Sequence, residues 1–326
     1  MENRPLLLRP TGKDYLWGGR RLNDEFAKNI PMSPLAETWE CSTHPAGKCF
    51  VAEGEFAGAA LADVLAARPD FLGTRHAAGG ELPLLVKFID ADKDLSVQVH
   101  PDDDYAETHE NGQRGKTELW YVLDAAPDAK LIYGFRQATS RREVQAALSS
   151  GKLAKLLQQI KVKKGDLFFI RPGTVHAVGA GTLIAEIQES SDLTYRLYDY
   201  DRIDKNGKKR PLHVDKALDV TDFRASPPPR QPMRVLKYRC GIASELLCRC
   251  RYFEVCRMIL NTERRQEVFF RTDETSFRVL LCVSGCGAVK FEGGEITFYK
   301  GDCIFVPAAS TNLRLHGFAQ FLDVRC

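Results

Sequence analysis

The sequence predicts a mainly β protein whose strands form barrels or sandwiches. Short apolar segments bounded by Gly, Pro, Asp or Asn follow one another at close spacing, which is typical of an all-β domain and not of alternating βαβ units. Helical periodicity is confined to two segments. A chain of 326 residues with 44% hydrophobic and 27% charged residues has the composition of a globular protein of about two domains.

The expected strands fall into two groups, each strand being a short run rich in β-branched or aromatic residues. The first group is expected at 82–90, 95–100, 118–124, 130–135, 166–172 and 182–188. The second group is expected at 252–260, 277–285, 287–291, 294–299 and 302–308.

Two segments have the spacing of helices. The first is 61–69. The second is 140–160, where apolar residues recur mostly at steps of three and four. We therefore expect a helical insertion at about 138–160 that forms a lid or cap on a β domain. The dipeptide Asn206-Gly207 predicts a tight hairpin or loop tip.

A short internal repeat indicates that the same β unit occurs twice. The segment KGDLFFIRP, which begins at Lys164, resembles KGDCIFVP, which begins at Lys300, and each follows an apolar strand signal. The first copy continues into Pro-Gly-Thr-Val-His176, whereas the second continues without a histidine. If one unit carries a metal, we expect it to be the first.

The proline-rich segment 226–232 is the best linker candidate, because proline disrupts both helices and strand pairing. We expect an N-terminal unit at 1–225, which carries the chemistry and the helical insertion. A degenerate C-terminal unit without metal ligands is expected at 233–326.

Composition and charge exclude several classes of partner. No apolar run approaches the roughly 18 residues of a membrane helix, and the N-terminal apolar stretch is too short for a signal peptide. The net charge of +3 without a long basic run argues against nucleic acid. The ten cysteines lack CxxC spacing and are interpreted mostly as small apolar residues in strands. We expect a cytoplasmic protein and leave its oligomeric state open.

Polar residues near the ends of expected strands predict a metal site. Gln98 and His100 share one strand face because alternate residues point the same way, and so do Lys116 and Glu118. His176 follows a Pro-Gly turn. Taken singly, each histidine could cap a turn or be a satisfied core residue. Together with an amide and a carboxylate that is costly to bury unpaired, they suit a borderline divalent ion such as zinc.

The sequence also resembles a known family. GDLFFIRPGTVHAV (165–178) resembles the second cupin motif, and segments in the expected order over roughly 15–220 resemble class I mannose-6-phosphate isomerase of the short bacterial type. These segments are LWGGRRL (16–22), AETWECS (36–42), LVKFIDA (85–91), LSVQVHPDDDYA (95–106), GKTELWYVL (115–123), RPGTVHAVGAGTLIAEIQESSDLTYRLYDYDR (171–202) and RPLHVDKALD (210–219). The resemblance implies two cupin (jelly-roll type) β-barrel domains, the second of them degenerate.

The resemblance further implies a zinc-dependent aldose–ketose isomerase with one Zn²⁺ ion per chain. It implies interconversion of mannose 6-phosphate and fructose 6-phosphate through a cis-enediol, so a sugar phosphate is the expected small-molecule partner. The residues that match the family's metal-ligand positions are Gln98, His100, Glu118 and His176.

Further site residues follow from the same resemblance. Arg196 matches the active-site arginine, and Lys87 and Lys116 match lysines that point into the pocket. Ser96 shares a strand face with Gln98 and is expected to contact the phosphate. Arg196 and Lys116 are the expected catalytic residues. The base that moves the proton remains open between Lys116 and a water on the metal.

Two other functional classes are compatible with the residues. One is a different metal-dependent cupin enzyme, such as an iron dioxygenase, which prefers two histidines and one carboxylate and would leave Gln98 unused. The other is a non-catalytic cupin that binds a sugar and holds a structural metal. Metal content and a turnover assay distinguish these classes.

Overall fold

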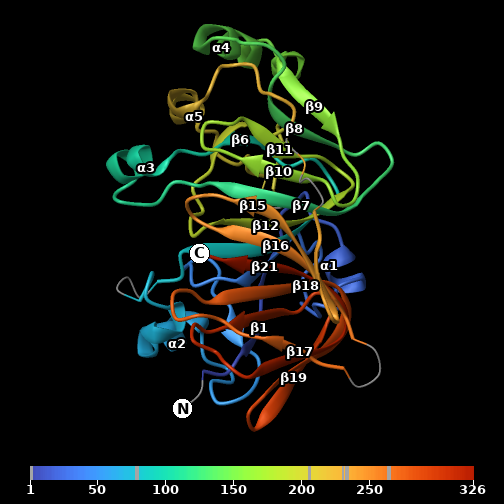
Figure 1. Ribbon diagram of the computed structural model, residues 1–326. Coiled ribbons are helices and arrows are strands. Elements are labelled where there is room, and N and C mark those ends of the chain that lie inside the picture. The colour runs from blue at the N-terminus through green and yellow to red at the C-terminus, as the bar shows by residue number, and fades with distance from the viewer. Residues whose placement is uncertain (1–2, 78–80, 205–206, 230, 232–234, 263–265) are drawn as a thin grey trace.

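The computed structural model of the chain describes residues 3–77, 81–204, 207–229, 231, 235–262 and 266–326 (Figure 1). Its helices are α1 (Arg21–Asp24), α2 (Leu61–Ala67), α3 (Asp103–His109), α4 (Arg141–Ser149) and α5 (Val214–Val220), with 3-10 turns η1 (Pro69–Leu72) and η2 (Leu153–Lys155). The first strands are β1 (Leu6–Arg9), β2 (Thr11–Lys13), β3 (Glu37–Cys41), β4 (Phe50–Val51), β5 (Leu84–Ala91), β6 (Val97–Val99), β7 (Glu118–Ala125), β8 (Lys130–Phe135), β9 (Leu157–Lys161), β10 (Leu167–Ile170), β11 (His176–Val178), β12 (Thr182–Glu189) and β13 (Tyr195–Tyr198). The later strands are β14 (Lys237–Arg239), β15 (Ile242–Arg249), β16 (Glu254–Asn261), β17 (Val268–Phe270), β18 (Arg278–Phe291), β19 (Gly294–Tyr299), β20 (Cys303–Val306) and β21 (Leu313–Arg325). Within the described ranges, no helix has the length and apolarity needed to cross a bilayer.

These strands form three sheets. One has the order β10-β7-β12-β5-β3-β2 and another the order β13-β6-β11-β8-β9. The largest runs β14-β15-β16-β21-β18-β20-β1-β4, with β17 beside β21 and β19 beside β18. The prediction of a mainly β fold is confirmed. The sheets do not close into barrels, however, because the edge strands β10 and β2 are not hydrogen-bonded to β13 and β9; the sheets pack as a cupin-like sandwich.

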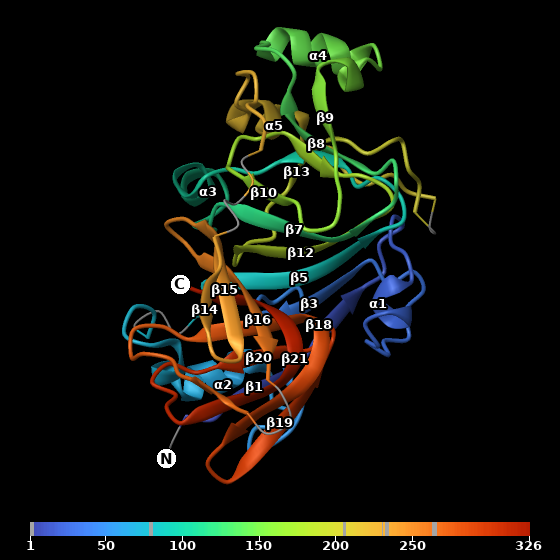
Figure 2. The ribbon, with the colours of Figure 1, turned by 45° about the vertical axis from the view of Figure 1, so that its right-hand side comes forward.

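The six-stranded sheet is the middle layer of the molecule (Figures 1 and 2). All eight residues of β5 and of β12 are buried. On β7, Trp120 and Val122 belong to a core shared with the five-stranded sheet, whereas Leu119 and Tyr121 belong to a core shared with the ten-stranded sheet. Burial on both faces explains why these strands are near-continuous apolar runs. It also means that a charged side chain on this sheet is removed from water and needs a partner.

The ten-stranded sheet contains strands from both ends of the chain. β1 pairs with β20, with Leu6 opposite Phe305, and β4 pairs with β1. The expected boundaries place β1 and β4 in the N-terminal unit, and the division at 225 and 233 stays a prediction. The proline-rich linker packs on that unit, since Ser226 N–H donates to the Phe135 carbonyl at 3.0 Å. Residues 230 and 232 of the linker and Asn206 of the expected turn lie outside the described residues.

The predicted internal repeat has a structural counterpart. In the first copy, the Gly165 N–H donates to the Val122 carbonyl at 2.8 Å, and in the second the Gly301 N–H donates to the Cys282 carbonyl at 2.8 Å. Both glycines have positive φ, a conformation that glycine adopts without strain. The strand after each glycine pairs antiparallel with an earlier strand of the same unit: β10 pairs with β7, and β20 pairs with β18. The repeat therefore consists of the same β unit used twice.

The helical insertion is shorter than predicted. Helix α4 begins after Ser140, whose hydroxyl accepts a hydrogen bond from Glu143 N–H, and η2 follows. Residues 157–161 form strand β9, which pairs with β8. The helix prediction is wrong there, because pairing along an available sheet edge outweighs the local spacing of Leu157 and Ile160. The helix expected at 61–69 is confirmed as α2, which gives way to η1 at Pro69.

The cysteine interpretation is confirmed. All ten thiols are free, and six of the cysteines lie in strands: Cys41, Cys248, Cys256, Cys282, Cys286 and Cys303.

The packing of the middle layer against the ten-stranded sheet predicts a large cost for Phe305→Ala. Phe305 is fully buried, and its ring stacks on Phe277 at a centroid distance of 5.2 Å. We expect the free energy of unfolding to fall by about 3 to 5 kcal/mol, because the substitution leaves a cavity. Urea unfolding followed by circular dichroism measures the change. Phe269→Ala, at a side chain that is 72% exposed, is the control and should change the value by less than about 0.5 kcal/mol; equal effects would contradict the proposed packing.

Candidate metal centre and active site

The two sheets of the N-terminal unit bring four sequence-predicted metal ligands together. Gln98 on β6 lies directly opposite His176 on β11, so both side chains project from one face of the five-stranded sheet. Glu118 is the first residue of β7 and projects from the facing six-stranded sheet. His100 follows β6 and shares the face of Gln98. Four residues that are far apart in sequence thus converge between the sheets.

The ligand atoms of His100, Glu118 and His176 all lie within 4.8 Å of one another, and all three residues are buried. Oε1 of Glu118 is 3.1 Å from Nε2 of His176 and 3.6 Å from Nε2 of His100. The amide nitrogen of Gln98 is 3.4 Å from Nε2 of His176, while its oxygen accepts from the Ser96 hydroxyl at 3.2 Å. A half-turn of this amide would present the oxygen to the cluster instead.

Backbone carbonyls fix the orientation of both imidazoles. Nδ1 of His100 lies 2.7 Å from the Leu193 carbonyl, and Nδ1 of His176 lies 2.8 Å from the Thr174 carbonyl. If each Nδ1 carries the hydrogen, each Nε2 presents a lone pair to the cluster, which is the usual support for a metal-bound histidine. Nε2 of His100 is buried without a hydrogen-bond partner in the described part of the chain. A divalent cation would satisfy this atom, so the residues present fit a metal ion.

The electrostatics of the cluster favour a neutral His100 and an ionised Glu118, the forms that bind metals. Burial, followed by the nearby Lys116 ammonium, lowers the pKa of His100 to about 3. Burial alone would raise the pKa of Glu118, but Lys116 and the neighbouring imidazoles outweigh it and hold this pKa well below its usual range. The ammonium of Lys116 lies 3.0 Å from Oε2 of Glu118.

Two lysines and two further carboxylates extend the cluster along the inner face of the six-stranded sheet. Nζ of Lys87 lies 3.2 Å from Glu186 and 3.8 Å from Glu37. Nζ of Lys116 lies 4.0 Å from Glu186. Burial lowers the pKa of Lys87, but Glu37 and Glu186 outweigh it and raise it, so Lys87 stays cationic. Charges of alternating sign thereby compensate one another in a buried layer.

A small cavity of about 60 Å³ lies beside the cluster. Its lining includes five sequence-predicted residues, namely Lys87, Ser96, Gln98, Lys116 and Arg196. Arg196 projects from β13 on the same face as Gln98, its direct neighbour across the strands. Nε of Arg196 is buried and has no hydrogen-bond partner among the described residues. The guanidinium is therefore available to an anionic or hydroxyl-rich ligand.

Sequence reasoning missed several charged residues that line this cavity, among them Glu186 and Arg210. Glu186 lies on β12, and Nε1 of Trp120 donates a hydrogen bond to its Oε2 at 2.9 Å. The missed signal was the alternation in TLIAEIQ, which places Glu186 and Gln188 on one strand face. Arg210 lies outside any strand, and its available signal was its place as the first residue of the family segment RPLHVDKALD.

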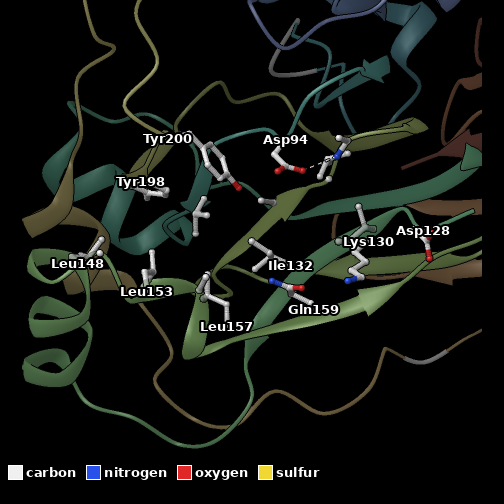
Figure 3. Close-up of a pocket in the computed structure, with 18 residues that line it drawn as sticks. Asp94, Asp128, Lys130, Ile132, Leu148, Leu153, Leu157, Gln159, Tyr198 and Tyr200 are labelled. Atoms are coloured by element: carbon white, nitrogen blue, oxygen red, sulfur yellow. Dashed lines mark hydrogen bonds between the residues drawn. The ribbon is translucent and has the colours of Figure 1, made fainter. Parts of the chain in front are cut away.

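A larger cavity of about 500 Å³ lies on the opposite face of the five-stranded sheet (Figure 3). Ile132 and Gln159 of the sheet line it, as do Leu148 and Leu153 of the helical insertion. On β11, the side chain of His176 faces His100 and Glu118, whereas Ala177 faces this cavity. The cavity is therefore separated from the candidate metal centre by the thickness of the sheet.

The fold and the site define a double cupin protein with a candidate metal centre in its N-terminal unit. Residues 6–127 match the phosphomannose isomerase type I catalytic domain, and residues 245–325 match the mannose-6-phosphate isomerase cupin domain. The chain is 37% identical over 320 residues to mannose-6-phosphate isomerase ManA of Bacillus subtilis, with 98% of each chain covered. It belongs to the type I phosphomannose isomerase family, as the sequence segments predicted.

Two further relatives agree with this assignment. The probable mannose-6-phosphate isomerase GmuF of Bacillus subtilis is 48% identical over 216 residues, which is 66% of this chain and 68% of that protein. The crystal structure of the mannose 6-phosphate isomerase from Bacillus subtilis superposes with a TM-score of 0.89 at 34% identity and covers 99% of both chains.

The buried carboxyl of Glu189, on β12, predicts a pH dependence of stability. Oε1 of Glu189 accepts a hydrogen bond from the Thr117 N–H at 2.7 Å, and burial raises the pKa of Glu189 from 4.5 to about 7. Between these values the folded state binds a proton that the unfolded state has released. The stability contributed by this proton is present at low pH and is lost as the pH rises toward 7.

We expect the free energy of unfolding to fall between pH 4.5 and 7 by at most about 1.4 kcal/mol per pH unit relative to Glu189→Gln. Denaturant unfolding at several pH values measures the difference between the two proteins. Glu107→Gln, at an exposed carboxylate, is the control and should leave the pH slope unchanged. A wild-type protein that gains stability relative to Glu189→Gln over this range would contradict the prediction.

Proposed function

We propose that this chain is a zinc-dependent isomerase that interconverts mannose 6-phosphate and fructose 6-phosphate. The observation that carries the proposal is the buried cluster of His100, Glu118 and His176, in a member of this family, beside a cavity lined by Arg196, whose Nε has no hydrogen-bond partner among the described residues. Gln98, His100, Glu118 and His176 would hold one Zn²⁺ ion per chain. The mixed nitrogen and oxygen donors support zinc over calcium or magnesium, which prefer oxygen ligands.

The cationic side chains around the cavity would bind the sugar phosphate. Lys87 and Arg196 carry positive charge, and Ser96 offers a hydroxyl to the phosphate group. Arg196 has free hydrogen-bonding capacity, since its Nε lacks a partner among the described residues. The narrow, mostly buried cavity would keep bulk water from the reacting carbons.

Isomerisation moves the carbon-bound proton between C2 and C1 and moves a hydroxyl proton between O2 and O1. A bound zinc ion supplies Lewis acidity that stabilises negative charge on these oxygens. Lys116 is proposed as the residue that holds the mobile proton at its Nζ, because this atom lies between Glu118 and Glu186 at the edge of the cavity. Arg196 is proposed to stabilise the enediolate electrostatically.

Zinc content and turnover should fall together in His176→Ala. Loss of a residue that merely supports a metal ligand costs roughly 10- to 100-fold in metal affinity, and loss of a ligand should cost at least as much. Metal analysis of the purified protein and a coupled assay for fructose 6-phosphate measure both quantities. His109→Ala, at an exposed histidine, should change neither. Chelation should abolish turnover and added zinc should restore it.

The same assay tests the other functional classes. Bound zinc without any ketose product from mannose 6-phosphate would favour a non-catalytic, sugar-binding cupin. Bound iron with turnover that requires oxygen would favour a dioxygenase. Unchanged zinc in His176→Ala would remove this histidine from the ligand set.

Arg196→Ala should separate catalysis from metal binding. We expect turnover to fall by about 100-fold, because one preorganised electrostatic contact to the reacting oxygens is lost, while zinc content stays at one ion per chain. Steady-state kinetics and metal analysis give the two values. Arg142→Ala, at an exposed arginine of α4, is the matched control. A variant that keeps the wild-type rate would exclude Arg196 from the mechanism.

A further inference from the structure

The two copies of the repeat can be aligned through their strand pairing. In the first unit Glu118 on β7 lies opposite Ile170, the last residue of β10. In the second unit Arg278 on β18 lies opposite Val306, the last residue of β20. Both pairs stand at the same place in the ladder that follows the glycine turn common to the two copies, at Gly165 and Gly301. Arg278 therefore occupies the position of the proposed carboxylate ligand.

The other ligand positions have also changed in the second unit. Gln98 lies opposite His176 where β6 meets β11, and Phe270 lies opposite Leu313 where β17 meets β21. Phe270 and Leu313 are buried in the core of the C-terminal unit and cannot bind a metal. The guanidinium of Arg278 lies over the Phe270 ring, 5.1 Å from its centroid. The positive charge at this position of the C-terminal unit therefore belongs to a side chain and not to a bound ion.

The register also places a carboxylate in each unit. Glu186 lies opposite Trp120 on β7, and Asp323 lies opposite Leu280 on β18. Nη1 of Arg278 donates to Oδ2 of Asp323 at 2.9 Å, and this contact fixes the guanidinium. Oδ1 of Asp323 is buried and has no hydrogen-bond partner within the described ranges.

Arg278 faces a cavity of about 1550 Å³, which is much larger than the cavity beside the proposed zinc site. The cavity is lined by further cations, Lys237, Arg239 and Arg271, which form no ion pair within the described part of the chain. Arg325 also lines it but is committed to Glu254, through a hydrogen bond from its Nε to Oε1 at 2.9 Å. Four carboxylates also line the cavity, namely Glu254, Asp273, Glu274 and Asp323. Of these carboxylates, Asp273 accepts a hydrogen bond from the Thr275 N–H at 2.9 Å.

We propose that this cavity is an anion site that binds a phosphate dianion, either free or as a phosphate monoester, with Arg278 at the ladder position that Glu118 holds in the N-terminal unit. One guanidinium fixed by Asp323 and stacked on Phe270 is preorganised to offer its remaining N–H groups to a phosphate oxygen. With Lys237, Arg239 and Arg271, five cations line the cavity against four carboxylates, so its lining carries a net positive charge. The site is independent of the proposed isomerase activity, because it binds phosphate without turnover.

Calorimetric titration of inorganic phosphate into the zinc-loaded full chain tests the proposal. We expect one binding event in the C-terminal cavity in addition to any at the catalytic cavity. In Arg278→Gln this event should weaken about tenfold or more, because a charge-assisted hydrogen bond is lost. Inhibition of the isomerase by phosphate measures binding at the catalytic cavity separately. The inhibition constant in Arg278→Gln should equal that of the wild-type protein. If the chain shows no isomerase activity, the titration still decides.

Two further variants guard against a folding defect caused by an unpaired Asp323. The double variant Arg278→Gln with Asp323→Asn removes both charges of the pair, and Arg271→Ala removes an exposed cation only. Both should weaken the same binding event, whereas Arg142→Ala on α4 should not. A second titration, with mannose 6-phosphate, distinguishes the two forms of phosphate. If the variants bind only inorganic phosphate more weakly, the ligand of the site is the free ion. If they bind both compounds more weakly, the site also accepts the phosphate ester. A wild-type protein without the additional event, or variants that bind as tightly as wild type, would overturn the proposal.

Discussion

The burial of the six-stranded sheet on both faces is the constraint on which the rest of the molecule depends. β5, β7 and β12 are covered by the five-stranded sheet on one side and by the ten-stranded sheet on the other. Charged side chains on such a layer are removed from water and must be compensated there. Lys87, Lys116, Glu118 and Glu186 compensate one another in part. The imidazoles of His100 and His176, whose Nε2 atoms lie near Oε1 of Glu118, complete a set of donors suited to a cation.

The repeat shows how one β unit can be adapted to two charge arrangements. The strand ladders of both units have the same register, so the same backbone position carries Glu118 in one unit and Arg278 in the other. A carboxylate at this position is suited to an external cation, whereas a guanidinium is itself the cation. This exchange explains why the two units can share a fold and differ in chemistry. It also underlies the anion site that we propose for the large C-terminal cavity.

Much of the strand content could be predicted from local sequence, because strands buried on both faces are continuous apolar runs. LVKFIDA and TLIAEIQ are such segments and correspond to β5 and β12. Short strands were missed: β11 and β13 have three and four residues, and their partners alone define them as strands. β21 was missed although it has 13 residues, since His316 and Gly317 interrupt its pattern. The sheets stay open because their edge strands are not hydrogen-bonded to one another. Local sequence patterns could not predict this, because they do not show which distant strands pair.

The sequence by itself determined the chemistry of the site: its donor types and the face that Gln98 and His100 share follow from residue identity and from the two-residue period of a strand. The sequence segments between residues 15 and 220 were sufficient to predict the family. Only the tertiary structure decided that Glu118 lies on a different sheet from His176 and yet within 3.1 Å of it. The tertiary structure also decided that Glu186 lies close to Lys87 and Lys116. It likewise decided that Arg278 occupies the strand position in the C-terminal unit that Glu118 occupies in the N-terminal unit. These relations depend on strand register and sheet packing between distant segments, which are set by burial of the whole chain and not by any local stretch of it.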